Sequence, residues 1–307
     1  MLDIRFVREH LDEVATAMQN RNHTWDSARF QELDESRRAS IAKEEELQAK
    51  RNAISKSIGK LMGEGKKEEA EAAKAEVSEL KNQIAQFSAE RAAADEGLRD
   101  MLMSTPNMPA DSTPVGKDED DNPEVRRWGT PRNFEAEGFE MKPHWDLSAE
   151  LSNIDAERAV KLAGSRFVLL GGLGARLERA LINFMADTHI SRGYKEWWCP
   201  AMANAETLTG TGQLPKFEED LFHTTEGLYL IPTAEVQLTN IHAGEVLEAS
   251  ELPLKYCAFT PCFREEAGSA GRDTRGLIRV HQFDKVEMVK YAKPEESYDD
   301  LESMVAD

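Results

Sequence analysis

The sequence predicts an α+β protein, in which an N-terminal antiparallel coiled coil of two helices precedes an antiparallel β-sheet domain flanked by helices. Two observations support this fold class. Residues 70–101 place apolar side chains at a spacing of three or four, which is the pattern of a coiled-coil seam. From about Asn133 onward, short β-prone runs alternate with loops that contain Gly and Pro, which favours a mainly antiparallel sheet with helices around it.

The expected helical arm covers residues 1–102 and contains two amphipathic helices joined by a tight turn. In the second helix the apolar pattern is broken only at Arg91. The turn is expected at 63–66, where glycine interrupts the pattern, and each helix needs the apolar stripe of the other because one such helix alone is marginally stable. In the first helix, apolar residues recur every seven positions at Leu47, Ile54 and Leu61.

Three further regions are expected around this arm. A short helix runs from Asp3, its N-cap, to Gln19. Residues 103–132 hold five prolines and an acidic run, which is typical of a linker or an extended connection. Residues 133–307 form the sheet domain, with a helix at 175–188, a helix after Pro294, and strands at 196–202, 228–231, 254–263 and 277–289.

Composition limits the function classes. The formal net charge of the chain is −19, and the first 102 residues carry 17 basic and 21 acidic side chains. This acidic balance argues against broad, non-specific binding of nucleic acid, so any RNA contact must use local basic patches. No segment reads as a signal peptide or a membrane span, and three cysteines without a Cys-x-x-Cys pair argue against a disulfide framework. These two observations together predict a cytoplasmic protein with no membrane partner.

The segment from Phe263 to Phe283 carries the most chemistry. Arg264, Glu265 and Glu266 close one expected strand, a loop of Gly, Ser, Asp and Arg follows, and Phe283 lies on the returning strand. A guanidinium suits phosphate, a carboxylate suits a base amino group or Mg²⁺, and an aromatic ring stacks on a base. The alternative is a solvated surface cluster beside a mobile hairpin. A glycine-rich segment at 171–174 reads as a strand-to-helix turn rather than a dinucleotide site, because no βαβ unit follows.

The Phe263–Phe283 segment closely resembles motif 2 of class II aminoacyl-tRNA synthetases, in the form found in bacterial seryl-tRNA synthetases. Further segments resemble the same family in order and spacing, from Leu2 to the last residue. The helical hairpin looks like the family's tRNA-binding arm. Residues 193–200 look like motif 1, with its dimer-forming strand and Pro200. Residues 210–217 look like a loop of this synthetase, and residues 231–235 look like its serine-binding strand.

The resemblance implies a serine–tRNA ligase that forms seryl-adenylate from L-serine and ATP and passes the seryl group to tRNA(Ser), and to tRNA(Sec) as well. Arg264 would bridge the α-phosphate and the serine carboxylate as the catalytic residue. Glu265 and Glu266 would belong to the ATP site, with Phe283 stacked on adenine. The serine pocket would be completed by Thr233, Ala234, Glu235 and Glu287, and the tRNA acceptor end would be contacted by Arg272 and Arg275.

The resemblance also implies ATP with Mg²⁺ bound to its phosphates, and a homodimer formed through motif 1 around Pro200. We expect no protein-bound zinc. The resemblance covers motifs 1 and 2 of the class II catalytic domain, and nothing after Glu287 resembles the third class II motif. We therefore expect an incomplete catalytic domain, truncated at its C-terminus and inactive as residues 1–307 alone. Two alternatives stay open: a catalytically inactive tRNA-binding protein built on a synthetase scaffold, and a coiled-coil interaction module with an acidic partner domain.

Overall fold

The computed structural model describes residues 1–151, 154–267 and 276–307, and the chain divides into two compact units. One unit spans Met1–Trp128 and the other Gly129–Asp307. Each unit is described by itself below. None of the helices in the described ranges is long and apolar enough to span a membrane.

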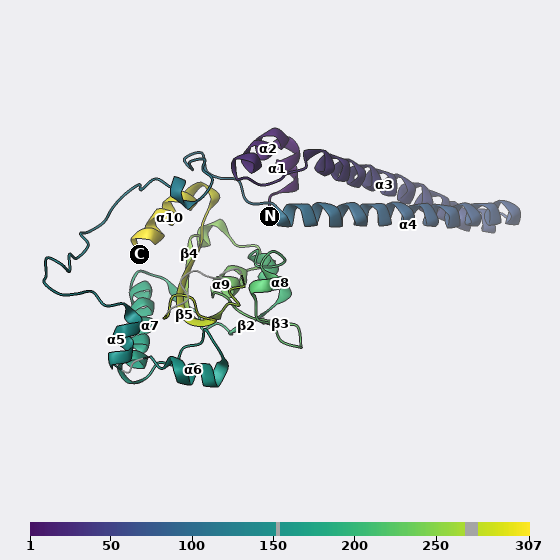
Figure 1. Ribbon diagram of the computed structural model, residues 1–307. Coiled ribbons are helices and arrows are strands. Elements are labelled where there is room, and N and C mark those ends of the chain that lie inside the picture. The colour runs from purple at the N-terminus through teal and green to yellow at the C-terminus, as the bar shows by residue number, and fades with distance from the viewer. Residues whose placement is uncertain (152–153, 268–275) are drawn as a thin grey trace. The chain divides into compact units, whose positions relative to one another are not determined.

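Two long helices form the arm of the N-terminal unit (Figure 1). Helix α3 spans Ser27–Gly63 and helix α4 spans Lys67–Ser104, and the two pack against each other in antiparallel directions. The turn between them contains Gly65 with φ of +78°, a left-handed conformation that glycine adopts without strain. The predicted hairpin and its turn are therefore confirmed. The side chains of the seam that are fully buried belong to Ala70, Leu80, Ala94, Leu98 and Leu102.

Arg91, which breaks the apolar pattern of the seam, has a partner on the facing helix. Its Nη1 lies 2.8 Å from Oε2 of Glu44, and the Glu44 side chain is only 11% exposed. A carboxylate removed from water in this way requires a paired charge. Because this pair fits at one position along the seam, it also favours one register of α3 against α4.

The N-terminal segment forms two short helices, so the single helix expected from Asp3 to Gln19 was wrong. Helix α1 spans Ile4–Glu9 and helix α2 spans Leu11–Asn20, and the chain breaks at His10, whose φ and ψ are −126° and 38°. Asp3 caps α1 as predicted, with its Oδ1 accepting from the backbone of Arg5 at 2.8 Å. Both helices contribute to one buried cluster with α3 and α4, and packing into that cluster outweighs a continuous helix.

An ion pair ties α1 to the arm. The guanidinium of Arg8 donates two hydrogen bonds of 2.6 Å to the carboxylate of Asp34 on α3, which is almost fully buried. The hydrogen bonds from Arg8 lower the pKa of Asp34 below its usual value, against the opposing effect of burial. The ionised pair of Arg8 and Asp34 therefore stabilises this end of the arm.

The C-terminal unit contains five strands and several helices within the described ranges. The strands are β1 Lys195–Glu196, β2 Met202–Asn204, β3 Leu228–Leu230, β4 Leu254–Phe263 and β5 Gln282–Tyr291. The α-helices are α5 His144–Leu151, α6 Ala156–Ala163, α7 Gly172–Ser191, α8 Ala205–Gly210, α9 Glu235–Asn240 and α10 Ser297–Ala306. Single 3₁₀ turns lie at η1 Glu119–Asp121 in the N-terminal unit, and at η2 Glu218–Asp220, η3 Ala249–Glu251 and η4 Pro294–Glu296 in the C-terminal unit.

The central sheet differs in one respect from the antiparallel sheet that was expected. β4 and β5 pair antiparallel along ten residues each, from Leu254 opposite Tyr291 to Phe263 opposite Gln282. β1, however, pairs with β4 in parallel, and β2 and β3 form a separate antiparallel pair. The α+β class is therefore confirmed, but the sheet is mixed. The expected strand at 196–202 divides because Pro200 has no N–H to give to a ladder.

The long β4–β5 ladder positions the chemical groups of this unit. β4 has its boundaries as predicted, and its interior, including Tyr256, Cys257, Ala258 and Cys262, is buried. β5 begins at Gln282, five residues after the expected start. Arg264 therefore directly follows a rigid buried strand, opposite the beginning of its partner.

Candidate functional site

The end of β4 is fixed by two hydrogen bonds to the segment that precedes β5. The backbone N–H of Arg264 donates to the carbonyl of His281 at 2.9 Å, and Nδ1 of His281 lies 2.9 Å from the carbonyl oxygen of Arg264. The His281 ring is also flanked by Phe167 and Phe222, with centroids 5.3 Å and 5.6 Å away. His281 thus holds the backbone of Arg264 in place.

A cavity of about 390 Å³ opens beside this strand end. Three cationic and three anionic side chains contribute to its wall, which gives a mixed charge suited to a zwitterion together with a polyanion. The cationic side chains are Arg264, Arg279 and Lys285, and the anionic ones are Asp220, Glu235 and Glu266. The remaining lining residues are Gln213, Phe217, Leu221, Pro232 and Thr233.

The guanidinium of Arg264 lies over the ring of Phe283, with Cζ 5.1 Å from the ring centroid. This is the distance of a cation–π contact. Phe283 itself does not line the cavity but backs the arginine that does. In this structure, therefore, Arg264 covers one face of Phe283, the ring that was predicted to stack on adenine.

Glu266 is held by an arginine that the sequence did not indicate. Oε2 of Glu266 accepts from Nη1 of Arg279 at 2.8 Å, and the carboxylate is largely buried. Its backbone has φ of 53°, an uncommon value for a residue with a side chain, and its carbonyl accepts from Arg166 at 3.2 Å. The orientation of this carboxylate toward the cavity is thus fixed by several contacts.

Asp220 fixes the chain on both sides of Glu266. Its carbonyl oxygen accepts from the N–H of Glu265 at 2.9 Å, and its Oδ1 accepts from the N–H of Ala267 at 3.0 Å. Glu265 is half-buried and lies outside the cavity wall. The structure therefore separates the two neighbouring glutamates into one that faces the cavity and one that does not.

Thr233, which lines the same cavity, is the centre of a hydrogen-bonded group. Its Oγ1 donates to Oε2 of Glu287 at 2.6 Å and accepts from Nζ of Lys285 at 3.0 Å. It also accepts from the backbone N–H of Glu235 at 3.1 Å. The ammonium of Lys285 forms an ion pair with the same oxygen of Glu287.

Residues 231–235 do not form a strand, which corrects the strand expected there. The chain leaves β3 at Leu230, turns, and begins α9 at Glu235, because the N–H of Glu235 is occupied by Thr233 rather than by a neighbouring strand. Ile231 still reaches β4, since its carbonyl accepts from the N–H of Phe263 at 2.9 Å. Ala234 is fully buried in the core next to this turn.

The structure thus brings together the predicted residues Arg264, Glu266, Thr233 and Glu235 around one cavity, with Glu287 joined to it through Thr233. Ala234, Glu265 and Phe283 lie beside it without lining it. Arg272 and Arg275 lie outside the described residues. Sequence reasoning missed Asp220, Arg279 and Lys285. Of these, Lys285 could have been found, because it lies two residues before Glu287 on the same strand, and residues two apart on a strand point to the same face.

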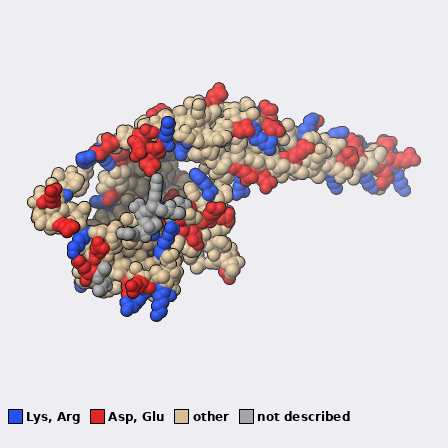
Figure 2. Space-filling model, in the orientation of Figure 1, with Lys and Arg blue, Asp and Glu red and all other residues tan. Residues whose placement is uncertain are grey.

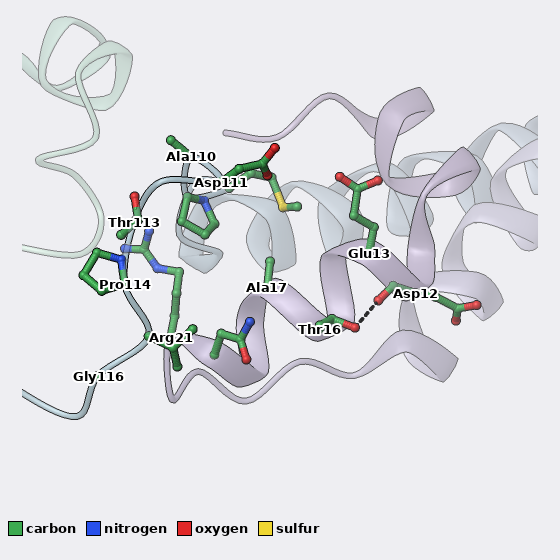
Figure 3. A pocket seen from close by; sticks show the side chains of 14 residues that line it. Asp12, Glu13, Thr16, Ala17, Arg21, Ala110, Asp111, Thr113, Pro114 and Gly116 are labelled. Carbon is green, nitrogen blue, oxygen red and sulfur yellow. Dashed lines mark hydrogen bonds between the residues drawn. The ribbon is translucent and has the colours of Figure 1, made fainter.

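A second hollow, of about 800 Å³, lies in the N-terminal unit, where residues 108–116 run beside α2 (Figure 3). Two of its polar groups bond within the protein: Thr16 Oγ1 donates to the carbonyl of Asp12 at 2.8 Å, as Figure 3 shows, and Arg21 donates to the carbonyl of Asn107 at 3.0 Å. None of the predicted site residues lines it. The hollow is a consequence of how this connection packs on α2.

Within the described ranges, the structure contains no group of three or more His, Cys, Asp or Glu side chains placed to hold a metal ion. Burial raises the pKa of the Cys257 and Cys262 thiols, so both are protonated, apolar groups of the β4 core.

Two family models match the chain. Residues 1–109 match the seryl-tRNA synthetase N-terminal domain, and residues 216–307 match the tRNA synthetase class II core domain (G, H, P, S and T). A serine–tRNA ligase of Pelobacter propionicus is 48% identical over all of this chain, and one of Neisseria meningitidis is 51% identical over 99% of it. The chain spans 72% of the length of each.

Solved structures agree with these matches. The seryl-tRNA synthetase of Pyrococcus horikoshii, complexed with ATP, superposes over the whole chain with a TM-score of 0.86 at 35% identity, and the chain covers 73% of it. The cytoplasmic serine–tRNA ligase of Naegleria fowleri, in complex with AMP, gives a TM-score of 0.82 at 27% identity and is covered to 74%. The chain therefore belongs to the seryl-tRNA synthetase family, a family of class II aminoacyl-tRNA ligases.

Proposed function

We propose that this protein activates L-serine with ATP to give seryl-adenylate and transfers the seryl group to tRNA(Ser), and also to tRNA(Sec). The observation that supports this most strongly is the cavity beside β4, which is lined by both Arg264 and Thr233, the residue that donates to Glu287. Activation needs a carboxylate to attack the α-phosphorus of ATP, with pyrophosphate leaving. Such a transfer depends on positioning and charge stabilisation rather than on a protein nucleophile.

The amino-acid half of the site is assigned to the turn before α9 and to β5. The carboxylates of Glu287 and Glu235 bind the serine ammonium, with Thr233 Oγ1 as a further acceptor and the backbone at Ala234 forming the floor of the pocket. Carboxylates around a cation favour molecules that carry the amine, because a ligand without it forms no ion pair with them. Arg264 binds the serine carboxylate and the α-phosphate, since its planar guanidinium can bond two oxygens at once.

The ATP half of the site is assigned to the strand ends. Glu266 accepts from the adenine amino group, Glu265 lies next to it, and adenine stacks on Phe283 after Arg264 turns from the ring toward the phosphates. Arg279 adds a second guanidinium on the cavity wall. Mg²⁺ arrives with the ATP phosphates, and carboxylate oxygens are suitable further ligands for it.

The tRNA is assigned to the arm and to the loop with Arg272 and Arg275. Along the arm, basic and acidic side chains lie interspersed on the face seen in Figure 2. Residues 1–102, which include the arm, carry a net charge of −4 while the rest of the chain carries −15, so this part is the less repulsive surface for RNA phosphates. Cytoplasmic location follows from this role.

The partner of the chain is proposed to be a second copy, bound around Pro200. One face of α7 is strongly exposed although it is apolar, and Trp198 next to Pro200 is exposed as well. Such a contiguous patch is typical of a protein interface. The exposed α7 residues are Leu173, Leu177, Leu181 and Phe184.

The test uses a chimera in which residues 1–307 replace the matched part of the Pelobacter propionicus ligase. The chimera should catalyse pyrophosphate exchange with ATP in the presence of serine but not of the other amino acids, and should charge tRNA(Ser). Exchange that depends on a different amino acid would contradict the substrate assignment. Binding of tRNA(Ser) without any exchange would instead support the alternative of an inactive tRNA-binding protein, which the preserved cavity disfavours.

A further inference from the structure

Lys285 occupies a position that the proposed function assigns to the substrate. Its ammonium pairs with Glu287 and donates to Thr233 Oγ1, the two groups that are proposed to bind the ammonium of serine. The two cations are of the same chemical kind, each a primary ammonium with three donors. The inference below rests on the proposed function of this site.

We propose that the ammonium of Lys285 is a placeholder for the substrate ammonium in the empty site, and that substrate binding displaces it toward the anionic groups of bound ATP. Lys285 is thus a positioning residue whose charge moves from the amino-acid pocket to the nucleotide pocket as the site fills.

The hydrogen-bonding capacity of Thr233 requires this displacement. A hydroxyl has one donor and two acceptor lone pairs. The proton goes to Glu287, and the two lone pairs accept from Lys285 and from the N–H of Glu235. A second ammonium can therefore bond Thr233 only after that of Lys285 has left.

The burial of Glu287 explains why a placeholder is present. Its side chain is 19% exposed. A carboxylate that is largely removed from water is costly unless a cation pairs with it. Lys285 supplies that cation while the site is empty, so the two acceptors stay aligned for the incoming ammonium.

The surroundings of Lys285 indicate where its charge goes. The side chain is 33% exposed and lines the same cavity as Arg264 and Arg279. A long flexible stem can move its head within such an open space. A released ammonium adds a third cation to the part of the cavity that is assigned to phosphates, so an ammonium ligand should strengthen ATP binding, and ATP should strengthen ammonium binding by the same factor.

The test measures this coupling by calorimetry on the chimera with the Pelobacter propionicus ligase, in which the part of the catalytic domain beyond residue 307 is present. The probe is L-serinamide, which keeps the ammonium of serine but has no carboxylate, and its affinity is measured with and without ATP. In the unaltered chimera, each ligand should tighten the binding of the other. In Lys285→Met, serinamide alone should bind about tenfold more tightly because no internal cation competes for Glu287, and the coupling to ATP should disappear.

Two variants control this experiment. Lys293→Met removes a lysine whose side chain has the same 33% exposure and which lies just after β5, outside the cavity, so it should leave both affinities and the coupling unchanged. Lys285→Arg keeps a cation beside Glu287 and should keep the weaker binding of serinamide. Circular dichroism checks that all variants melt as the unaltered chimera does.

Unchanged or weaker serinamide binding in Lys285→Met, or coupling to ATP that persists in it, would overturn the placeholder role while leaving serine recognition intact. A chimera that binds neither serine nor serinamide would contradict the proposed function, and the inference that rests on it would be lost as well.

Discussion

The arm and the cavity are held together by opposite kinds of interaction. In the arm, one apolar seam runs between two helices, and the charged pair of Arg91 with Glu44 interrupts it. Around the cavity, charged and polar side chains converge from loops and strand ends that are up to about seventy residues apart in sequence, from Gln213 to Lys285. The arm should therefore be robust and separable, whereas the site should be sensitive to single charges.

The largest expected effect is a separation of the two activities. In the chimera, deletion of residues 40–101 should abolish the charging of tRNA while leaving serine-dependent pyrophosphate exchange close to its original rate, because the cavity lies wholly in the C-terminal unit. Both rates are measured on the same preparation. Equal loss of charging and exchange would show that the arm is not a separate RNA-binding element.

The seam itself can be broken by one charge. Leu80 is 3% exposed within the seam, and Leu80→Asp would bury a carboxylate that has no suitable partner there, at a cost of about 3 kcal/mol or more. Thermal melting followed by circular dichroism should show a lower transition and reduced helix content.

Ser78→Asp places the same charge on the exposed side of α4 and serves as its control. It should change the melting temperature little. If both variants melt alike, the seam does not carry the stability of the arm.

A smaller but sharper effect is expected at the strand end. Arg264→Lys in the chimera keeps a positive charge but loses the planar group that bonds two oxygens, and should cost about 2 kcal/mol of transition-state stabilisation, or about a thirtyfold lower exchange rate. The melting temperature should not change, because the Arg264 contacts to His281 come from its backbone. Exchange at nearly the original rate would remove Arg264 from the catalytic site.

The arm was predictable from sequence, and the cavity only in part, for a physical reason. Helix geometry places residues three and four apart on one face, so a seam is visible in the sequence before any contact is known. The motif residues Arg264 and Glu266 were found through their place at a strand end. Asp220 and Arg279 were not, because their role depends on where a loop meets that strand, which no periodicity encodes.

Two errors in the secondary structure have the same origin. The break at His10 and the turn that replaces a strand at 231–235 are decided by packing and by single hydrogen bonds such as that of Thr233 with the N–H of Glu235. Local propensity did not indicate either of them. Tertiary contacts commonly override such weak preferences at short elements.

The smallest expected effect is a pH dependence that belongs to the arm unit alone. The folded pKa of Asp34 is lowered by Arg8, so this pair stabilises the fold above the unfolded value of about 4, and that stability is lost as the pH falls below it. Thermal melting of residues 1–128 should show an acid-induced loss, of which Asp34→Asn removes a share on the order of 1 kcal/mol. If the melting temperature of Asp34→Asn depended on pH in the same way as that of the unaltered residues 1–128, the result would contradict this role of Asp34.

The most direct test of the whole account is a crystal structure of the chain with a sulfamoyl analogue of seryl-adenylate. The account predicts that the amino group of the analogue bonds Glu287 and Thr233, that Arg264 bonds the sulfamoyl group, and that adenine lies against Phe283 with Lys285 moved away from Glu287. An analogue bound elsewhere, or bound in the cavity with its amino group away from Glu287, would contradict it.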